Sequence, residues 1–390
     1  MKVTKYLSTL LISTCLIIGL ILHPQTASAQ DGASFETNEG WGLNVTGAIP
    51  VFLNLSTHDE FSADGEDQFA TRVMSGFNPG NVTFTVSAPT QNGIDVSAVF
   101  QINHHLHGPS IQNAGLFEGR VADIVISGDF GTINAGKGFG IFNSISIGDN
   151  GSGMGVGRFG GPDAADATLG RIGSGYTYAN FNPRVTYTTP DLGGFTAKVG
   201  LINPEKPGGP SSNLETAGPR FEGQIDYVFD LGEGSLQAWA GGLYQNVSVA
   251  NPDFDFNFSG WDTGLKLSLA GLTLTGSYSE TKSIGADGLI GINISGGSAL
   301  DQADIDGTQW YTEATYDFGG FLLGASYGEG SQDANSTAVG SAGDVTNELL
   351  MGFARISVTD NLTFMLEAQS FSSEAQADYS AFILGTQITF

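Results

Sequence analysis

The sequence predicts an all-β protein, a 16-stranded antiparallel transmembrane β-barrel with short turns at one end and long loops at the other. Three observations support this prediction: an apolar leader that marks export, alternation of apolar and polar residues at period 2, and connections that alternate between short and long. Period 2 is typical of strands with one apolar and one polar face. A closed barrel satisfies every backbone polar group within a bilayer without any spanning helix.

The first thirty residues have the pattern of a secretory signal peptide. Lys2 and Lys5 precede an apolar run from Leu7 to Leu22, and the small residues Ala27-Ser28-Ala29 follow. An N-terminal membrane anchor is the alternative, but the apolar run is short for a spanning helix. We therefore expect residues 1–29 to be a signal peptide and residues 30–390 to form the barrel. The one cysteine, Cys15, lies in the leader, so no disulfide framework is expected.

The composition excludes some classes of partner. Without Lys2 and Lys5 the chain has 12 basic residues against 40 acidic ones, and the formal charge falls from −26 to −28. An acidic surface of this kind argues against nucleic acid as a partner. Residues 30–390 contain no run of 18 apolar residues, whereas the whole chain has 57 glycines and 26 phenylalanines. For an exported chain this favours a membrane barrel over a helical membrane protein.

The alternation starts with Trp41, Leu43 and Val45 on one face, and it recurs along the chain. Asn78-Pro79-Gly80 interrupts the second run, and we expect a bulge there. The expected strands are 41–51, 69–88, 94–102, 118–127, 131–137, 175–189, 195–201, 221–229, 236–244, 261–269, 272–278, 310–316, 321–327, 346–358, 361–373 and 382–390.

The connections fall into two classes that alternate strictly. Short turns lie near 90, 130, 192, 232, 270, 318 and 360, and long polar loops lie near 60, 110, 155, 210, 252, 295 and 337. Short periplasmic turns and long external loops are typical of outer-membrane barrels. A soluble propeller or β-helix also repeats strands, but neither requires this alternation. The longest segment without a hydrophobic period, 138–174, is the third long loop, and we expect it to fold inside the barrel and narrow its pore.

Three segments carry a resemblance to a known family. One runs from Glu118-Gly119-Arg120 through Gly128-Asp129-Phe130-Gly131 to Lys137. The second is 184–195, and the third is the closing strand with its terminal Phe390. Together they resemble the trimeric general porins of Gram-negative outer membranes, in the neisserial, β-proteobacterial and Rhodobacter-like branch.

The resemblance implies a 16-stranded barrel in the outer membrane of a Gram-negative bacterium, with an inward-folded third loop. It also implies a homotrimer whose partners are outer-membrane lipid and lipopolysaccharide. The chain departs from the family in charge, because few basic residues remain to build an arginine-rich wall.

The predicted function is a water-filled channel for passive diffusion of ions and small hydrophilic solutes. Conduction through a wide pore depends on bore and wall charge rather than on reactive groups. We expect acidic loop residues to face arginines across the constriction, and the net acidity predicts a cation preference. Arg120 faces inward only through a bulge. The constriction candidates are Asp149, Arg158, Asp163, Asp166 and Arg171, and the wall candidates are Arg72, Arg120, Arg184 and Lys198.

Other functions are weighed against the channel. A substrate-specific channel for a sugar or an anion is the main alternative, and an adhesin or structural role is another. An outer-membrane enzyme would need a Ser/His or Asp/His constellation, which the sequence does not suggest, so neither catalysis nor a cofactor is predicted.

Two groups of residues raise the question of metal binding. His104, His105 and His107 could bind zinc or copper, but we expect a solvated or subunit-packing loop. Several loop acids could share divalent cations with lipopolysaccharide, although solvated acids are the preferred interpretation. These acids are Asp253, Asp255, Asp301, Asp304 and Asp306.

Overall fold

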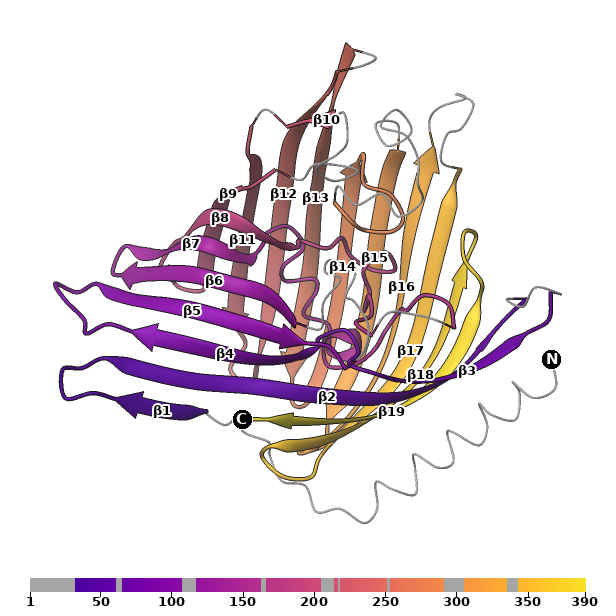
Figure 1. The fold of residues 1–390 in the computed structure, drawn as a ribbon, viewed down its shortest axis with the longest axis horizontal. Helices are drawn as coiled ribbons and strands as arrows, with labels where there is room; N and C mark the ends of the chain where they lie inside the picture. The colour runs from indigo at the N-terminus through magenta and orange to yellow at the C-terminus, as the bar shows by residue number, and fades with distance from the viewer. Residues whose placement is uncertain are drawn as a thin grey trace.

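The computed structural model is a closed antiparallel β-barrel, as predicted (Figure 1). It describes residues 32–60, 65–106, 117–162, 166–204, 214–216, 218–250, 253–290, 305–334 and 343–390. The barrel closes where β19 (Tyr379–Thr389) pairs with β2 (Gly42–His58). Sixteen positions around the wall follow, because β3 (Gln68–Met74) and β4 (Gly80–Ser87) share the second position and both pair with β2.

The remaining wall strands pair in sequence order, each with its neighbour along the chain. They are β5 (Asp95–His104), β6 (Phe117–Gly128), β7 (Gly131–Phe139), β8 (Phe181–Thr188), β9 (Phe195–Ile202), β11 (Arg220–Asp230), β12 (Gly234–Ala250), β13 (Asp253–Leu269), β14 (Leu272–Lys282), β15 (Ile305–Asp317), β16 (Phe321–Ala334), β17 (Val345–Ser357) and β18 (Leu362–Ser373).

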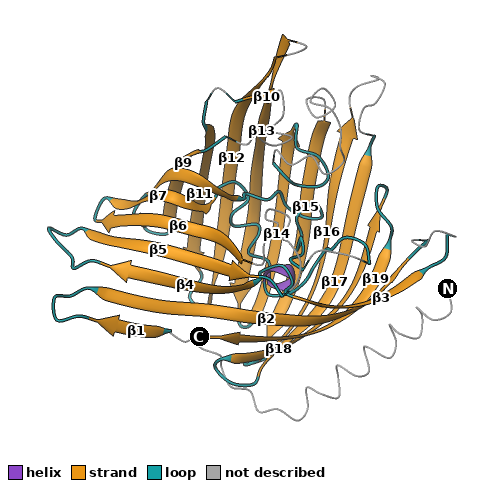
Figure 2. Ribbon diagram, in the orientation of Figure 1, coloured by secondary structure: helices purple, strands orange, loops and turns teal. Residues whose placement is uncertain are grey.

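Two short strands extend the sheet. β1 (Ala33–Glu36) pairs with the start of β2, at the point where the pairing of β19 with β2 ends, so β1 continues the line of β19 along β2. β10 (Leu214–Glu215) pairs with β12. Figure 2 shows one short helix inside the barrel, α2 (Asn150–Gly153), among the described residues. None of the helices in the described ranges is long and apolar enough to cross a membrane.

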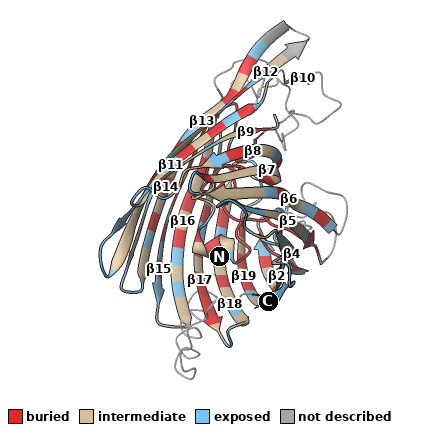
Figure 3. Ribbon diagram, turned by 90° about the vertical axis from the view of Figure 1, so that its left-hand side faces the viewer, coloured by how far each residue is buried: buried red, intermediate tan, exposed pale blue. Residues whose placement is uncertain are grey.

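The register gives each strand one lipid face and one lumen face. In β8, Val185 and Tyr187 are 53% and 37% exposed, whereas Thr186 between them and Asn182 before them are buried. Figure 3 shows the same alternation of buried and exposed residues along the strands. Because apolar side chains can face lipid, exposed apolar residues on the outer face are the expected arrangement for a membrane barrel.

A tight turn joins β6 to β7, where the sequence reads Gly128-Asp129-Phe130-Gly131. Gly131 has φ +107, and a Cβ there would lie 2.2 Å from the carbonyl oxygen of Thr188. Only glycine fits this conformation next to the neighbouring strand. The turn therefore fixes where β7 begins, and after this short strand the chain enters the lumen.

Three details of the predicted strands and loops are wrong. The connection near 252 is not a long polar loop, because β12 and β13 pair as far as Ala250 and Asp253. The sixth strand begins at Phe181 rather than at Gly175, because Tyr176 and Tyr178 alternate like strand residues but pack inside the barrel. The second strand is interrupted over 75–79, earlier than Asn78. Phe77, within this interruption, is buried in the same inner cluster as Tyr176.

Candidate functional site

The connection between β7 and β8, residues 140–180, lies inside the barrel, as expected for the third long loop; we call it the inward loop. Figure 1 shows it running through the lumen between these two strands. Its residues bond to wall strands far away in the sequence, including β11, β15 and β18. The strands that surround the lumen therefore also hold the inward loop in place.

Three glutamates of the wall hold the backbone of the inward loop. Glu222 of β11 accepts a hydrogen bond from the Phe142 amide at 3.0 Å. Glu313 of β15 accepts from the Asn150 and Gly151 amides at 2.8 and 2.9 Å. Glu367 of β18 accepts from the Val156 amide at 3.1 Å. Each of these side chains satisfies backbone amides that are buried away from water, so the three glutamates serve as anchors for the loop.

Apolar contacts add a second kind of anchor. Val156 and Phe159 of the inward loop pack into a buried cluster with residues of β2, β3, β17, β18 and β19. The Phe159 amide also donates to the Tyr379 hydroxyl at 3.1 Å. Apolar side chains on the lumen face would be unfavourable in contact with water. The loop removes them from water. The wall members are Phe52, Met74, Leu349, Met351, Phe353, Met365, Phe371, Tyr379, Ala381 and Ile383.

Two of the predicted constriction residues form the interior of the loop. Asp149 accepts from the Ser152 amide at 2.7 Å and from the Tyr176 hydroxyl at 3.1 Å. Arg171 lies 3.8 Å from the Asp149 carboxylate and donates to the Leu349 carbonyl of β17 at 3.2 Å. Both side chains are fully buried. They therefore stabilise the loop and join it to the wall.

Arg158, a third constriction candidate, is 1% exposed. Its guanidinium donates to the Ile172 carbonyl at 3.0 Å and lies 5.2 Å from the centroid of the Phe371 ring. A cation over an aromatic face is attracted by the ring quadrupole. Arg158 thus links two parts of the inward loop to β18.

Asp166, the fourth candidate, ties the end of the loop to the wall. Its carboxylate accepts from the Ser75 amide at 3.0 Å, beside the break between β3 and β4, and from the Leu106 amide at 2.8 Å. His105 lies between Asp166 and Glu118 of β6, with N–O distances of 3.6 and 3.4 Å. Asp166 and then Glu118 raise the pKa of His105 to about 8, against the opposing effect of burial.

The acidity of Asp166 follows from the same contacts. Burial alone would raise its pKa, but hydrogen bonds from His105, Ser75 and Leu106 hold the pKa below its ordinary value. The carboxylate is therefore charged where it holds the loop.

The predicted wall cations also face the lumen. Arg184 of β8 pairs with Asp123 at 2.9 Å and donates to the Phe139 carbonyl at 3.0 Å. The register between β5 and β6 shifts at Gln101/Ile102 and skips Arg120. This is the bulge that an inward Arg120 requires, and its guanidinium bonds to Glu118 at 3.1 Å.

Arg72 and Lys198 complete the wall set. Arg72 donates to the Pro162 carbonyl of the inward loop at 2.6 Å. Lys198 lies opposite Gln224 on the lumen face of β9 and is half-buried. Asp163 lies outside the described residues, so the structure places only the other four constriction candidates. Whether these residues narrow the path of a solute stays a prediction.

Two features were missed in the sequence. The bonds between the wall glutamates and the loop backbone have no local sequence signal. The apolar lumen residues did have a signal, because Phe256 and Phe258 share the inward face with the polar Asp262. An apolar residue at an inward position of a porin-like strand indicates that another segment covers it.

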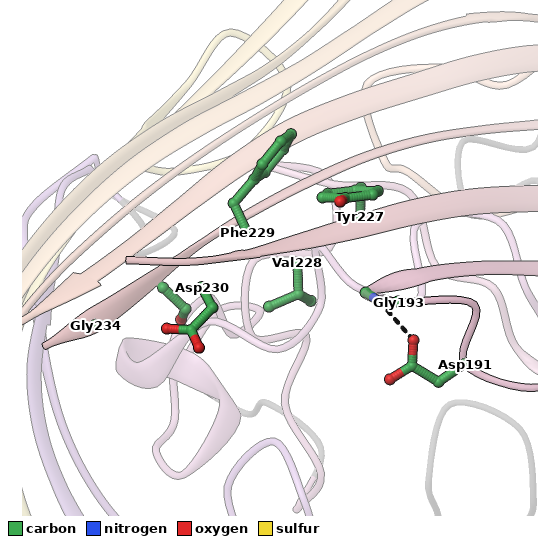
Figure 4. Close-up of a pocket in the computed structure, with 9 residues that line it drawn as sticks. Asp191, Gly193, Tyr227, Val228, Phe229, Asp230 and Gly234 are labelled. Carbon is green, nitrogen blue, oxygen red and sulfur yellow. Dashed lines mark hydrogen bonds between the residues drawn. The ribbon is translucent and has the colours of Figure 1, made fainter. Parts of the chain in front are cut away.

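A surface cavity of about 560 Å³ lies at the short-turn rim. Figure 4 shows its lining, with Tyr227 and Phe229 above Asp230 and Asp191. Asp191 accepts from the Gly194 amide at 2.6 Å, and Asp230 from the Gly232 amide at 2.7 Å. Both acids thus stabilise their turns.

Among the described residues, no group of three or more His, Cys, Asp or Glu side chains could hold a metal ion. His105 is occupied by its two carboxylates, and His104 packs against Phe117 with 5.2 Å between ring centroids. His107, Asp301 and Asp304 lie outside the described residues.

Comparison with known proteins supports the same assignment. A family model described as Gram-negative porin matches residues 14–376. No curated protein matches the sequence. Solved structures match over nearly the whole chain, although at low identity.

Three of them illustrate the fold. The outer membrane channel DcaP of Acinetobacter baumannii has TM-score 0.66 and 15% identity, covering 92% of this chain and 100% of that one. An anion-selective porin from Comamonas acidovorans has TM-score 0.62 and 15% identity, covering 90% and 100%. Salmonella typhi OmpF, in a complex with daunomycin, has TM-score 0.58 and 14% identity, covering 92% and 100%. The family and the fold are those of channels rather than of enzymes. The chain therefore belongs to the Gram-negative porins and is an outer-membrane channel.

Proposed function

We propose that the protein is a homotrimeric, cation-preferring porin through which ions and small hydrophilic solutes diffuse passively. The observation that carries the proposal is the lining beside β4–β9. The inward residues of β4 are all polar and remain half-buried: Asn81, Thr83, Thr85 and Ser87. A polar, partly open wall opposite a fixed loop is the arrangement that lets hydrated solutes pass.

The rim at the short turns supports the cation preference. Every acid there is exposed, and no lysine or arginine lies at these turns. The acids are Asp95, Asp129, Asp191, Asp230, Glu233, Asp317 and Asp360. A mouth lined by one sign of charge raises the local concentration of counter-ions, here cations. Inside, the cations Arg120 and Arg184 are paired with Glu118 and Asp123, so they add little net positive charge.

An anion-specific channel is the second candidate. Lys198 makes no ion pair within 4 Å among the described residues, and it faces the lumen near Arg184. The similar Comamonas acidovorans protein is described as anion-selective, which shows that the fold accommodates that preference. The excess of rim acids makes cation preference the better-supported proposal.

Two further parts of the proposal concern the assembled protein. Residues 1–29 are proposed to be removed as a signal peptide, leaving residues 30–390 as the barrel. A homotrimer is proposed because a similar outer membrane protein, OmpT of Vibrio cholerae, is described in a trimer form, at TM-score 0.54 and 12% identity. Outer-membrane lipid and lipopolysaccharide would surround the trimer.

Planar-bilayer recordings of the purified trimer test the proposal. In a tenfold KCl gradient we expect ohmic channels whose reversal potential has the sign for K⁺ over Cl⁻. The opposite sign would overturn the cation preference and favour the anion channel. Absence of conductance from folded trimer would overturn diffusion itself. Asp166→Asn, repeated with the same protocol, tests the predicted constriction, since an unchanged conductance and selectivity would remove Asp166 from it.

A further inference from the structure

We infer that residues 283–290, the start of the connection between β14 and β15, form a second inward segment that seals the lumen beside β12–β17 and confines solutes to the side of β4–β9. The inference rests on the proposed diffusion function. It concerns which part of the lumen conducts, and four sets of contacts support it.

The two inward elements bond to each other directly. The Tyr178 amide of the inward loop donates to the Gly288 carbonyl at 2.7 Å, and Tyr178 and Leu289 form a bridge. Gly288 has φ +67, and a Cβ there would lie 2.6 Å from the Gly173 nitrogen. This close approach requires glycine. The second inward segment therefore packs against the inward loop rather than lying over it loosely.

Two amide side chains of the wall bind both elements at once. Asn347 of β17 donates to the Gly173 carbonyl at 3.2 Å and to the Ala286 carbonyl at 3.0 Å. Gln309 of β15 accepts from the Gly175 amide at 3.2 Å and donates to the Ala286 carbonyl at 3.4 Å. Both side chains are buried. The wall thus holds the two elements together as one layer.

The second inward segment also covers an apolar part of the wall. Ile284 and Ile290 pack with Phe142 of the inward loop against the lumen faces of β12 and β13. The wall residues of this cluster are Leu243, Val247, Phe256 and Phe258, all at most 8% exposed. Such residues would cost free energy if they lined an aqueous pore. These apolar residues can occupy inward positions because the second inward segment covers them.

The polar lumen residues nearby are buried as well. Thr281 of β14 is 5% exposed, and its hydroxyl donates to the Ile284 carbonyl at 2.8 Å. Thr83 of β4 also faces the lumen but stays half-buried, with Gln101 as its neighbour at 3.2 Å. Both threonines occupy lumen positions, but they differ in access to water. Thr281 is buried because residues 283–290 cover it, whereas Thr83 is only half-buried.

Cysteine accessibility tests the inference. Residues 30–390 contain no cysteine, so each introduced thiol is the single reactive one in the processed chain. The matched variants are Thr83→Cys and Thr281→Cys, probed with a small cationic methanethiosulfonate during bilayer recording. We expect Thr83→Cys to react within seconds and its conductance to fall, whereas Thr281→Cys reacts at least about tenfold more slowly. Equal reaction rates for the two thiols would overturn the inference.

A second pair of variants tests the cover itself. In the Thr281→Cys background, Gly288→Ala forces the second inward segment away from the inward loop and should raise the reaction rate at least about tenfold. Gly232→Ala is the control, because Gly232 also has a positive φ, +80, but a Cβ there meets nothing within 4 Å. An unchanged rate in Gly288→Ala would count against the cover. If Gly288→Ala fails to fold, the threonine pair alone decides.

The outcomes separate the two proposals. Conducting channels with equal thiol reactivity would overturn the sealed sector and leave the diffusion function in place. Folded, trimeric protein that conducts nothing before modification would overturn the diffusion function.

Discussion

The inward residues on the two sides of the lumen differ in polarity and in exposure. Beside β4–β9 the inward residues are mostly polar and half-buried, as in Thr83 and Gln101. Beside β12–β13 the inward residues Val247 and Phe258 are apolar and have no exposed surface. The polar-inside pattern of a membrane barrel holds where water reaches the wall. It fails where the chain folds back to cover the wall, so an inward apolar residue marks an internal contact.

The charged side chains of the wall also differ in their contacts. Where the inward loop meets β11, β15 and β18, Glu222, Glu313 and Glu367 accept hydrogen bonds from its backbone amides. On the open side, Arg120 and Arg184 keep 12% and 10% of their side chains exposed next to their acids. The carboxylates thus hold the inward loop, while the guanidinium groups lie nearer to water. The expected arrangement of exposed loop acids opposite arginines is not what the described part of the inward loop presents.

The largest expected effect comes from the apolar cover. Phe258→Ala should lower the free energy of unfolding by about 3–5 kcal/mol, because the cavity lies between protein elements and cannot refill. Phe100→Ala on the lipid face, where the ring is 51% exposed, is the control, since lipid fills the space. Urea unfolding in lipid vesicles measures both. Equal losses for the two variants would mean that Phe258 is not covered by protein.

A smaller loss is expected from one loop anchor. Glu313→Ala leaves the Asn150 and Gly151 amides without their acceptor, at a cost of about 1–3 kcal/mol for each buried group. Glu313→Gln keeps an acceptor oxygen and should lose less. The measurement is the rate of protease cleavage within 140–180 in folded trimer, together with open-channel noise. Cleavage in Glu313→Ala no faster than in the unaltered protein would show that the carboxylate does not hold the loop.

The sequence predicts the strands of the wall better than it predicts the contacts inside the lumen. Strand positions follow from local alternation and turns, and this is why 16 strands and the position of the third long loop are confirmed. Contacts inside the lumen join residues such as Val156 and Glu367, which are far apart in the chain, and no local pattern encodes them. Tyr176 and Tyr178 show the failure in detail, because their alternation is the same whether they face a sheet neighbour or an inner cluster. The inward phenylalanines of β13 are the sequence signal that indicates an internal contact.

A pH effect is expected at the end of the inward loop. The pKa of His105 is raised to about 8 from an ordinary value of 6.5, so its stabilising charge is complete below pH 6.5 and is lost as pH rises through about 8. The groups that face it are Glu118 and Asp166, with Arg120 beside Glu118. Channel noise should therefore increase between pH 7 and 9.

His105→Gln removes the titrating group and tests whether His105 causes the pH dependence of the channel noise. The variant should show one noise level across that range, whereas His104→Gln, which alters the neighbouring ring, should keep the pH dependence. A pH dependence that persists in His105→Gln would assign the effect to another group.

The smallest effect is expected at the short-turn rim. Asp191→Asn combined with Asp230→Asn removes two exposed acids beside the open side of the wall. Near 0.03 M salt, where screening is weak, the K⁺ preference should fall by a few millivolts of reversal potential; at 1 M salt, where the screening length is about 3 Å, it should not change. Asn at both positions can still accept the turn hydrogen bonds from Gly194 and Gly232, so the fold is preserved. A shift that is equal at both salt concentrations would place the selectivity filter at the rim itself. No shift at either concentration would place it deeper, among the paired charges beside the inward loop.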